Sequence, residues 1–203
     1  MVTVVPQRAA AIVLAVLGLA FASCDGEPDA ASPPDEPIAE LAQHDGSFCP
    51  RSLPRASQES YGFGTSERAE EAPSLWEPEE AWVCEYVTKN IAPRDANGAW
   101  YEWVRQGEPR RLSGEALHSF AAALRDLRPS EADVCTSDLG PRYLVSYVYE
   151  SDLTGVVIDD YGCQEIRLTD EPFETVPGDA AQPGTVAGVL MGPADLLRDL
   201  KVK

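Results

Sequence analysis

The feature that most constrains this chain is the distribution of its five cysteines, the first of which directly follows an apolar run. Residues 9–22 are almost entirely apolar, and Arg8 is the only charge before Cys24. A basic residue, a short apolar stretch and small residues before a break are typical of a cleaved secretory signal. The apolar run is shorter than the roughly 20 residues that a membrane-spanning helix needs. We therefore expect residues 1–23 to be a signal peptide.

Cys24 resembles the lipid-attachment cysteine of bacterial lipoproteins. Ala22 and Ser23 match the small residues that precede that cysteine, whereas Phe21 stands where leucine is usual. A thioether to diacylglycerol would use the odd cysteine and leave four for an exported domain. Since two acyl chains anchor a protein stably, the resemblance implies a palmitate-bearing lipoprotein on the outer face of the cell membrane. The alternative is ordinary cleavage near Ala22, which leaves Cys24 as a free thiol.

An acidic, proline-rich segment follows Cys24. Residues 25–45 contain seven acids and four prolines but no lysine or arginine. Such a segment has too little apolar surface to offset the entropy of ordering, and its like charges extend it. We therefore predict a tether over residues 24–46 and a single extracellular domain over residues 47–203.

The charge of the chain limits its partners. The full chain has a formal net charge of −18, and because residues 1–23 carry one arginine and no acid, the remainder carries −19. This charge disfavours nucleic acid and anionic membrane surfaces as partners. The membrane contact that we expect is therefore the lipid anchor at Cys24.

Two groups of strands are predicted. Residues 81–88 and 99–105 are rich in β-branched and aromatic residues and flank an Asn97-Gly98 turn signal, which predicts a hairpin. Three further segments, separated by turn residues, predict a three-strand meander. They are residues 142–149, 155–159 and 163–168.

Helical periodicity predicts an amphipathic helix over residues 114–127, with Ser113 as its N-cap and Pro129 beyond its end. A short helix is expected over residues 193–200. Strands and helices that do not alternate indicate an α+β domain with an antiparallel sheet, with a helix on one face and water on the other.

Four cysteines remain for disulfides, and they allow three pairings. We expect the neighbours in sequence to pair, which gives Cys49–Cys84 and Cys135–Cys163. The other pairings stay open, Cys84–Cys163 among them.

Through the order of its short cysteine motifs, the chain resembles a group of uncharacterised actinobacterial secreted proteins and lipoproteins. The resemblance covers about residues 48–170 and rests on Cys-Pro, Cys-x-Tyr, Cys-x-x-Asp-x-Gly and Gly-Cys elements at Cys49, Cys84, Cys135 and Cys163. It implies a disulfide-stapled extracellular domain, and it brings no activity and no catalytic residue.

The sequence offers little for catalysis. His44 lies in the predicted tether and His118 in the predicted helix, and there is no Gly-x-Ser-x-Gly, phosphate-binding loop or dinucleotide motif. The acids Asp152, Asp159 and Asp160 flank the turns of the meander, where they would hold a hard cation or simply favour the turn. We expect no catalytic residue, no metal site and no cofactor.

Trp100, Tyr101 and Trp103 are the best candidates for binding. An exposed aromatic row would stack on a glycan or grip a protein, and the alternative is that these rings fill a core. The sequence therefore favours a non-catalytic binding module for an envelope component or a protein partner. The alternative is a small secreted hydrolase or an inhibitor-like domain.

Overall fold

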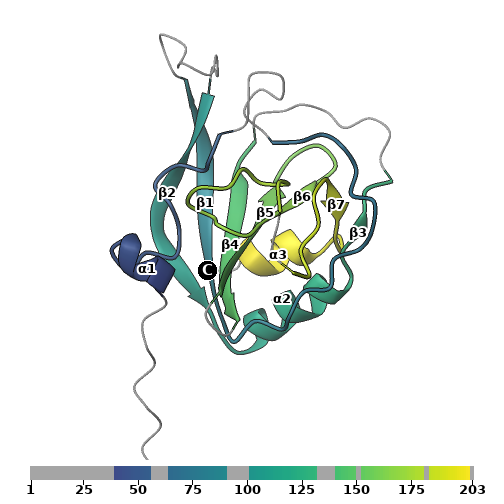
Figure 1. Ribbon diagram of the computed structural model, residues 1–203, viewed down its shortest axis with the longest axis horizontal. Coiled ribbons are helices and arrows are strands. Elements are labelled where there is room, and N and C mark those ends of the chain that lie inside the picture. Colours follow the sequence, from purple (N-terminus) through teal and green to yellow (C-terminus); the bar gives the residue numbers. More distant parts are fainter. Residues whose placement is uncertain are drawn as a thin grey trace, which may run out of the picture. The chain divides into compact units, whose positions relative to one another are not determined.

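One antiparallel sheet organises the fold, and its strand order departs from the order along the chain (Figure 1). The computed structural model describes residues 39–55, 64–90, 101–131, 140–149, 152–180 and 183–201, all within one unit, Pro37–Lys203. The spatial order of the sheet is β2-β1-β4-β5-β6-β7-β3. The strands are β1 (Glu80–Asn90), β2 (Tyr101–Leu112), β3 (Arg128–Pro129), β4 (Arg142–Tyr149), β5 (Asp152–Asp159), β6 (Ile166–Thr169) and β7 (Leu190–Met191).

The helices of the described residues are short: α1 (Ala39–Gln43), α2 (Glu115–Arg125) and α3 (Leu196–Lys201). Gly114 occupies the N-cap of α2 with a φ of 54°, and no side chain caps this end, so Ser113 does not have the predicted role. Arg125 is the last helical residue, two residues before the predicted end.

The predicted α+β class is wrong, because the described structure is mainly β. The predicted hairpin and meander are present, but β1 pairs with β4 and joins them into one sheet. The sheet also includes β3 and β7, each of two residues. Strands this short leave no period-2 pattern to detect in the sequence. The described helices are short additions to a structure that is mainly one β-sheet.

The hairpin extends beyond the residues expected from the sequence because β2 contains a bulge. Val83 pairs with Arg110 and Glu85 with Gln106, so three residues of β2 stand opposite one of β1. They begin at Gly107, with a φ of 72°, and end at Pro109. Proline has no N–H to donate and is tolerated at the bulge of an edge strand.

The first core of the sheet lies on the face covered by α2 and α3, which we call the helix face. Tyr143, Val145 and Tyr147 of β4 point to this face, and Ile158 of β5 and Ile166 of β6 join them. They pack against apolar side chains of the two helices, including Phe120, Leu124, Leu196, Leu197 and Leu200. This is the amphipathic packing that the helical periodicity predicts.

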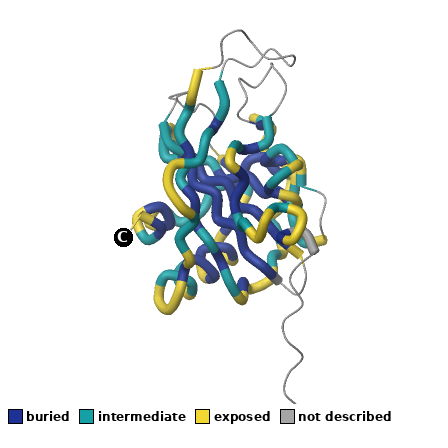
Figure 2. Tube along the Cα trace, turned by 90° about the vertical axis from the view of Figure 1, so that its left-hand side faces the viewer, coloured by how far each residue is buried: buried dark blue, intermediate teal, exposed yellow. Residues whose placement is uncertain are grey.

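The opposite face, which we call the loop face, is also buried, and the expectation of one wet face is wrong. Leu144 and Val157 are fully buried there beside Cys84, Tyr86 and Trp103. Figure 2 shows the buried residues gathered along the middle of the sheet. The cover on the loop face comes from irregular segments. Cys49 and Leu53 belong to one, and Pro172 of another lies so close to Gly155 that a Cβ there would be 3.0 Å from its Cγ.

Residues 39–46, within the range predicted as a tether, belong to the folded unit. Leu41 of α1 is buried against Val148 and Leu153. His44 stacks on Phe173 with ring centroids 3.8 Å apart. One buried leucine and one stacked ring are enough to dock the end of an otherwise acidic segment.

The predicted disulfide between Cys49 and Cys84 is present, and it ties the segment that covers the loop face to β1. Cys163 is disulfide-bonded as well. Its expected partner, Cys135, lies outside the described residues, so the second pairing stays a prediction.

We predict that replacing Cys49 and Cys84 together by alanine lowers the free energy of unfolding by about 3–4 kcal/mol, because the bond restricts the unfolded chain over 35 residues. Urea unfolding of parent and double variant measures this difference. Equal midpoints and slopes would contradict a stabilising role for the bond.

A second prediction concerns alkaline pH. Burial raises the pKa of Tyr147 to about 12, partly opposed by its hydrogen bond with Thr154. An unfolded tyrosine ionises near pH 10, so stability is unchanged below about pH 10 and falls as the pH rises towards 12. Phenylalanine does not ionise, so Tyr147→Phe should lose about 2–3 kcal/mol less stability than the parent between pH 10 and pH 12. This figure is the pKa difference of about 2 units at 1.36 kcal/mol per unit.

The measurement is the free energy of unfolding from pH 8 to pH 12, with tyrosinate absorbance followed in parallel. If every tyrosine ionised near pH 10 while the protein stayed folded, the burial of Tyr147 would be contradicted.

Candidate functional site

A network of charged side chains is buried on the loop face, where β4, β5 and β6 lie side by side. Its centre is Asp159, whose Oδ1 lies 2.7 Å from Nε of Arg142 and whose Oδ2 accepts a hydrogen bond of 2.8 Å from Nη1 of Arg167. All three side chains are at most 3% exposed. Arg167 also pairs with Glu165 and donates from Nε to the carbonyl oxygen of Thr65 at 2.8 Å.

Charge within this network is balanced, since two guanidinium groups face two carboxylates. Burial lowers the pKa of Arg167, but Asp159 and Glu165 outweigh that effect and raise this pKa, so the guanidinium keeps its charge. Arg142 lies 4.6 Å from the ring centroid of Trp103 and donates from Nε to Tyr161 Oη at 3.1 Å. The pairing holds the strands and a covering segment together.

Asp159 is poorly placed for acid–base chemistry. Each carboxylate oxygen lies against a guanidinium, and the residue is 2% exposed. A general base needs a free oxygen within reach of a substrate proton. The network is therefore a structural feature of the loop face.

The three acids considered for a cation do not form a common site. Asp152 and Asp159 stand at opposite ends of β5, and Asp160 pairs with Lys201 at 2.5 Å. A strand rises about 3.3 Å per residue, so the ends of β5 are too far apart to share one ion. The part of the chain that the structure describes contains no cluster of three or more His, Cys, Asp or Glu suited to a metal.

The aromatic residues expected to bind a ligand are distributed differently. Trp103 is 1% exposed and belongs to the core of the loop face, which corrects its assignment to a surface row. Tyr101 is half-buried at the start of β2, and Trp100 lies outside the described residues. His118 is exposed on α2.

Trp76, which the sequence analysis did not single out, is the exposed large apolar residue of the described chain, at 58%. It lines a recess of about 210 Å³ beside α2, together with Glu77 and Arg125. No period or motif marks Trp76, because it lies in an irregular segment.

A further recess is acidic. Its volume is about 440 Å³, and it lies between residues 65–71 and 185–188, with Glu67, Glu70 and Asp179 in its lining. The lining acids are exposed to solvent.

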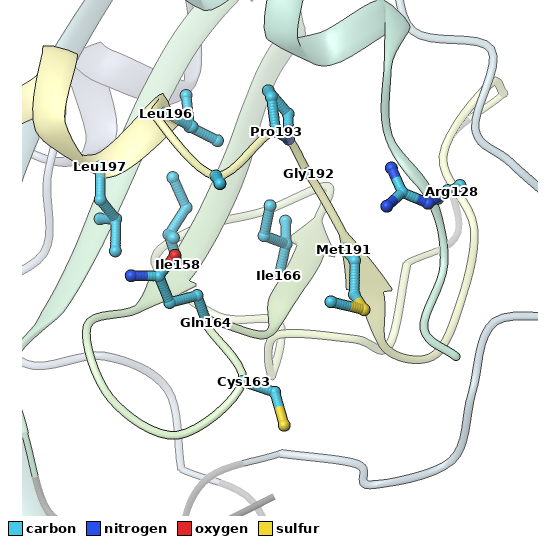
Figure 3. Close-up of a pocket in the computed structure, with 11 residues that line it drawn as sticks. Arg128, Ile158, Cys163, Gln164, Ile166, Met191, Gly192, Pro193, Leu196 and Leu197 are labelled. Atoms are coloured by element: carbon cyan, nitrogen blue, oxygen red, sulfur yellow. The ribbon is translucent and has the colours of Figure 1, made fainter. Parts of the chain in front are cut away.

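The recess best suited to an apolar ligand lies between the sheet and α3, and we call it the α3 recess (Figure 3). Its volume is about 230 Å³. Its walls are apolar side chains from β5, β6, β7, α3 and the segment between β7 and α3: Ile158, Ile166, Met191, Pro193, Leu196 and Leu197.

The polar side chains of the α3 recess are few. Arg128 of β3 extends towards the recess in Figure 3, whereas Gln164 lies on the other side of the recess and the disulfide-bonded Cys163 lies below both. Gln164 adopts a φ of 54°, which is uncommon for a residue with a side chain and tends to occur at functional positions. An apolar hollow with a few polar groups at its rim is suited to binding a ligand.

Comparison with known proteins does not assign this site. No protein-family model matches the chain, and no curated protein or solved structure is significantly similar to it. The resemblance to actinobacterial lipoproteins thus stays a prediction. Among the helices described, none is long and apolar enough to cross a membrane.

We predict that Asp159→Asn destabilises the protein by about 3–5 kcal/mol, because it removes the buried carboxylate that both Arg142 and Arg167 face. Asp160→Asn is the matched control: its partner Lys201 is 40% exposed, so the loss should be below about 1 kcal/mol. Chemical denaturation measures both variants. Similar losses at the two positions would contradict the central role of Asp159.

Proposed function

We propose that this chain is a lipid-anchored extracytoplasmic binding module. It is attached through Cys24 to the outer face of the cell membrane and binds an envelope component or a partner protein without altering it chemically. The observation that carries the proposal is the α3 recess, an apolar hollow with Arg128 and Gln164 at its rim.

The chemistry of the recess supports binding rather than turnover. Its walls are hydrocarbon and its cation is an arginine, which does not give up a proton near neutral pH. Cys163, the one lining residue with a nucleophilic atom, is disulfide-bonded. These groups can desolvate and orient a ligand.

Export is supported by the pattern before Cys24 and by the Cys49–Cys84 bond, since disulfides persist in oxidising compartments outside the cytoplasm. The acidic, proline-rich composition of the residues after Cys24 is typical of a tether. A binding domain held in this way samples the space next to the membrane.

The test uses the full chain with Cys24→Ala. We expect this variant to leave the membrane fraction and to lose labelling by a fatty-acid precursor, because the thiol that would carry the lipid is gone. Ser23→Ala, which keeps a small residue before the cysteine, is the control and should stay anchored. Unchanged membrane retention without labelling of the parent would contradict the anchor.

The same released chain tests the binding role. We expect it to rebind washed envelopes saturably, and Ala194→Trp, at an exposed residue that lines the recess, to weaken rebinding. Failure of the released chain to rebind would contradict the proposed function.

A further inference from the structure

We infer that the α3 recess binds a medium-chain carboxylate, with the hydrocarbon tail between the sheet and α3 and the carboxylate on Arg128. This inference rests on the proposed binding function and specifies the ligand class of the same recess. Three features of the described residues carry it: the size of the hollow, the nature of its walls and the pairing of charges around it.

The size of the hollow selects a single short tail. A volume of about 230 Å³ is roughly eight times the share of one water molecule in the liquid, about 30 Å³. One hydrocarbon chain of medium length fills such a space, and the two long chains of a phospholipid do not. Ordinary ligand pockets begin near 300 Å³, so the recess suits a ligand with one slender apolar part.

The walls select hydrocarbon. Ile158, Ile166 and Leu197 are buried members of the helix-face core, and they form the inner side of the recess in Figure 3. A tail placed against them leaves water at a gain of roughly 0.8 kcal/mol for each buried methylene group.

Gly192 lets the backbone after β7 pack closely against these walls. A Cβ at this position would lie 2.8 Å from Cδ1 of Ile166 and 3.2 Å from Cδ2 of Leu127. A larger residue there would collide with these core side chains.

The charge at the rim selects an anion. Most cations of the described chain have an acidic or carbonyl partner, such as Arg125 with Glu77 and Lys201 with Asp160. Arg128, in contrast, forms no side-chain ion pair within the described residues. An arginine beside an apolar hollow, with no ion pair among the described residues, offers a place for the anionic group of a ligand.

The guanidinium favours a carboxylate among anions. It presents paired N–H donors in the geometry of a carboxylate, so that one arginine suffices for a single negative charge. A phosphate dianion would call for more positive charge than this rim holds.

The experiment uses the full chain in washed envelopes and a medium-chain fatty acid with a photoactivatable diazirine in its tail. Peptide mass spectrometry locates the crosslinks. We expect labelling of residues that line the recess, within residues 158–166 or 191–197, and competition by octanoate. A fatty alcohol with the same tail reports on the apolar part alone.

Variants separate the tail from the headgroup. Arg128→Gln should lower labelling by the acid about fivefold, the effect of losing one exposed charge pair, and leave labelling by the alcohol unchanged. Arg128→Lys should restore part of the loss. Arg125→Gln removes an equal charge from α2 and should change nothing, whereas Ala194→Trp should abolish both labels.

Two results overturn the inference but leave the proposed function intact. One is equal labelling by acid and alcohol with no effect of Arg128→Gln. The other is labelling only of residues that do not line the recess, while the Cys24→Ala chain still rebinds envelopes. If labelling and rebinding both fail, the proposed function falls with the inference. Labelling of the recess that requires Arg128 confirms the carboxylate site.

Discussion

Burial of charge on the loop face is the constraint on which the rest of the structure depends. Asp159 lies between Arg142 and Arg167, and all three are nearly inaccessible to water. Because an unpaired charge in such a place costs several kcal/mol, the strands that carry these residues must stay in register. The segment that contains Thr65, whose carbonyl oxygen accepts a hydrogen bond from Arg167, must also remain in place over these strands. The network therefore couples the alignment of the sheet to its irregular cover.

This coupling explains how a sheet with so few helices buries both faces. The helix face is covered by α2 and α3 in the ordinary way. On the loop face the five-residue α1 covers Val148 and Leu153, and irregular segments cover the sheet around Cys84 and Trp103. Irregular segments have little regular hydrogen bonding to hold them. The Cys49–Cys84 bond and the ion network fix these segments to the sheet. On the loop face, the disulfide and the ion network hold the covering segments in the way that the apolar side of a helix holds α2 and α3 on the other face.

The α3 recess depends on the same architecture. Its walls belong to the helix-face core, and its rim is built from the short strand β3 and the turn between β5 and β6. Asp159 and Arg167, just before and just after this turn, are members of the buried network. The turn residues that reach the recess are thus held from the opposite face of the sheet.

Local sequence patterns determined much of this protein. The β-branched and apolar runs of β4 and β5, the periodicity of α2, the short C-terminal helix and the Cys49–Cys84 pair were predictable, because each depends on neighbours in sequence or on cysteine order. β5 nevertheless begins at Asp152, three residues before the start expected from the sequence. Only the tertiary structure decided that the hairpin and meander share one sheet and that Trp103 is core. It also decided that Asp159 is paired and that Arg128 faces a hollow. These outcomes depend on contacts between segments far apart along the chain, which no local period encodes.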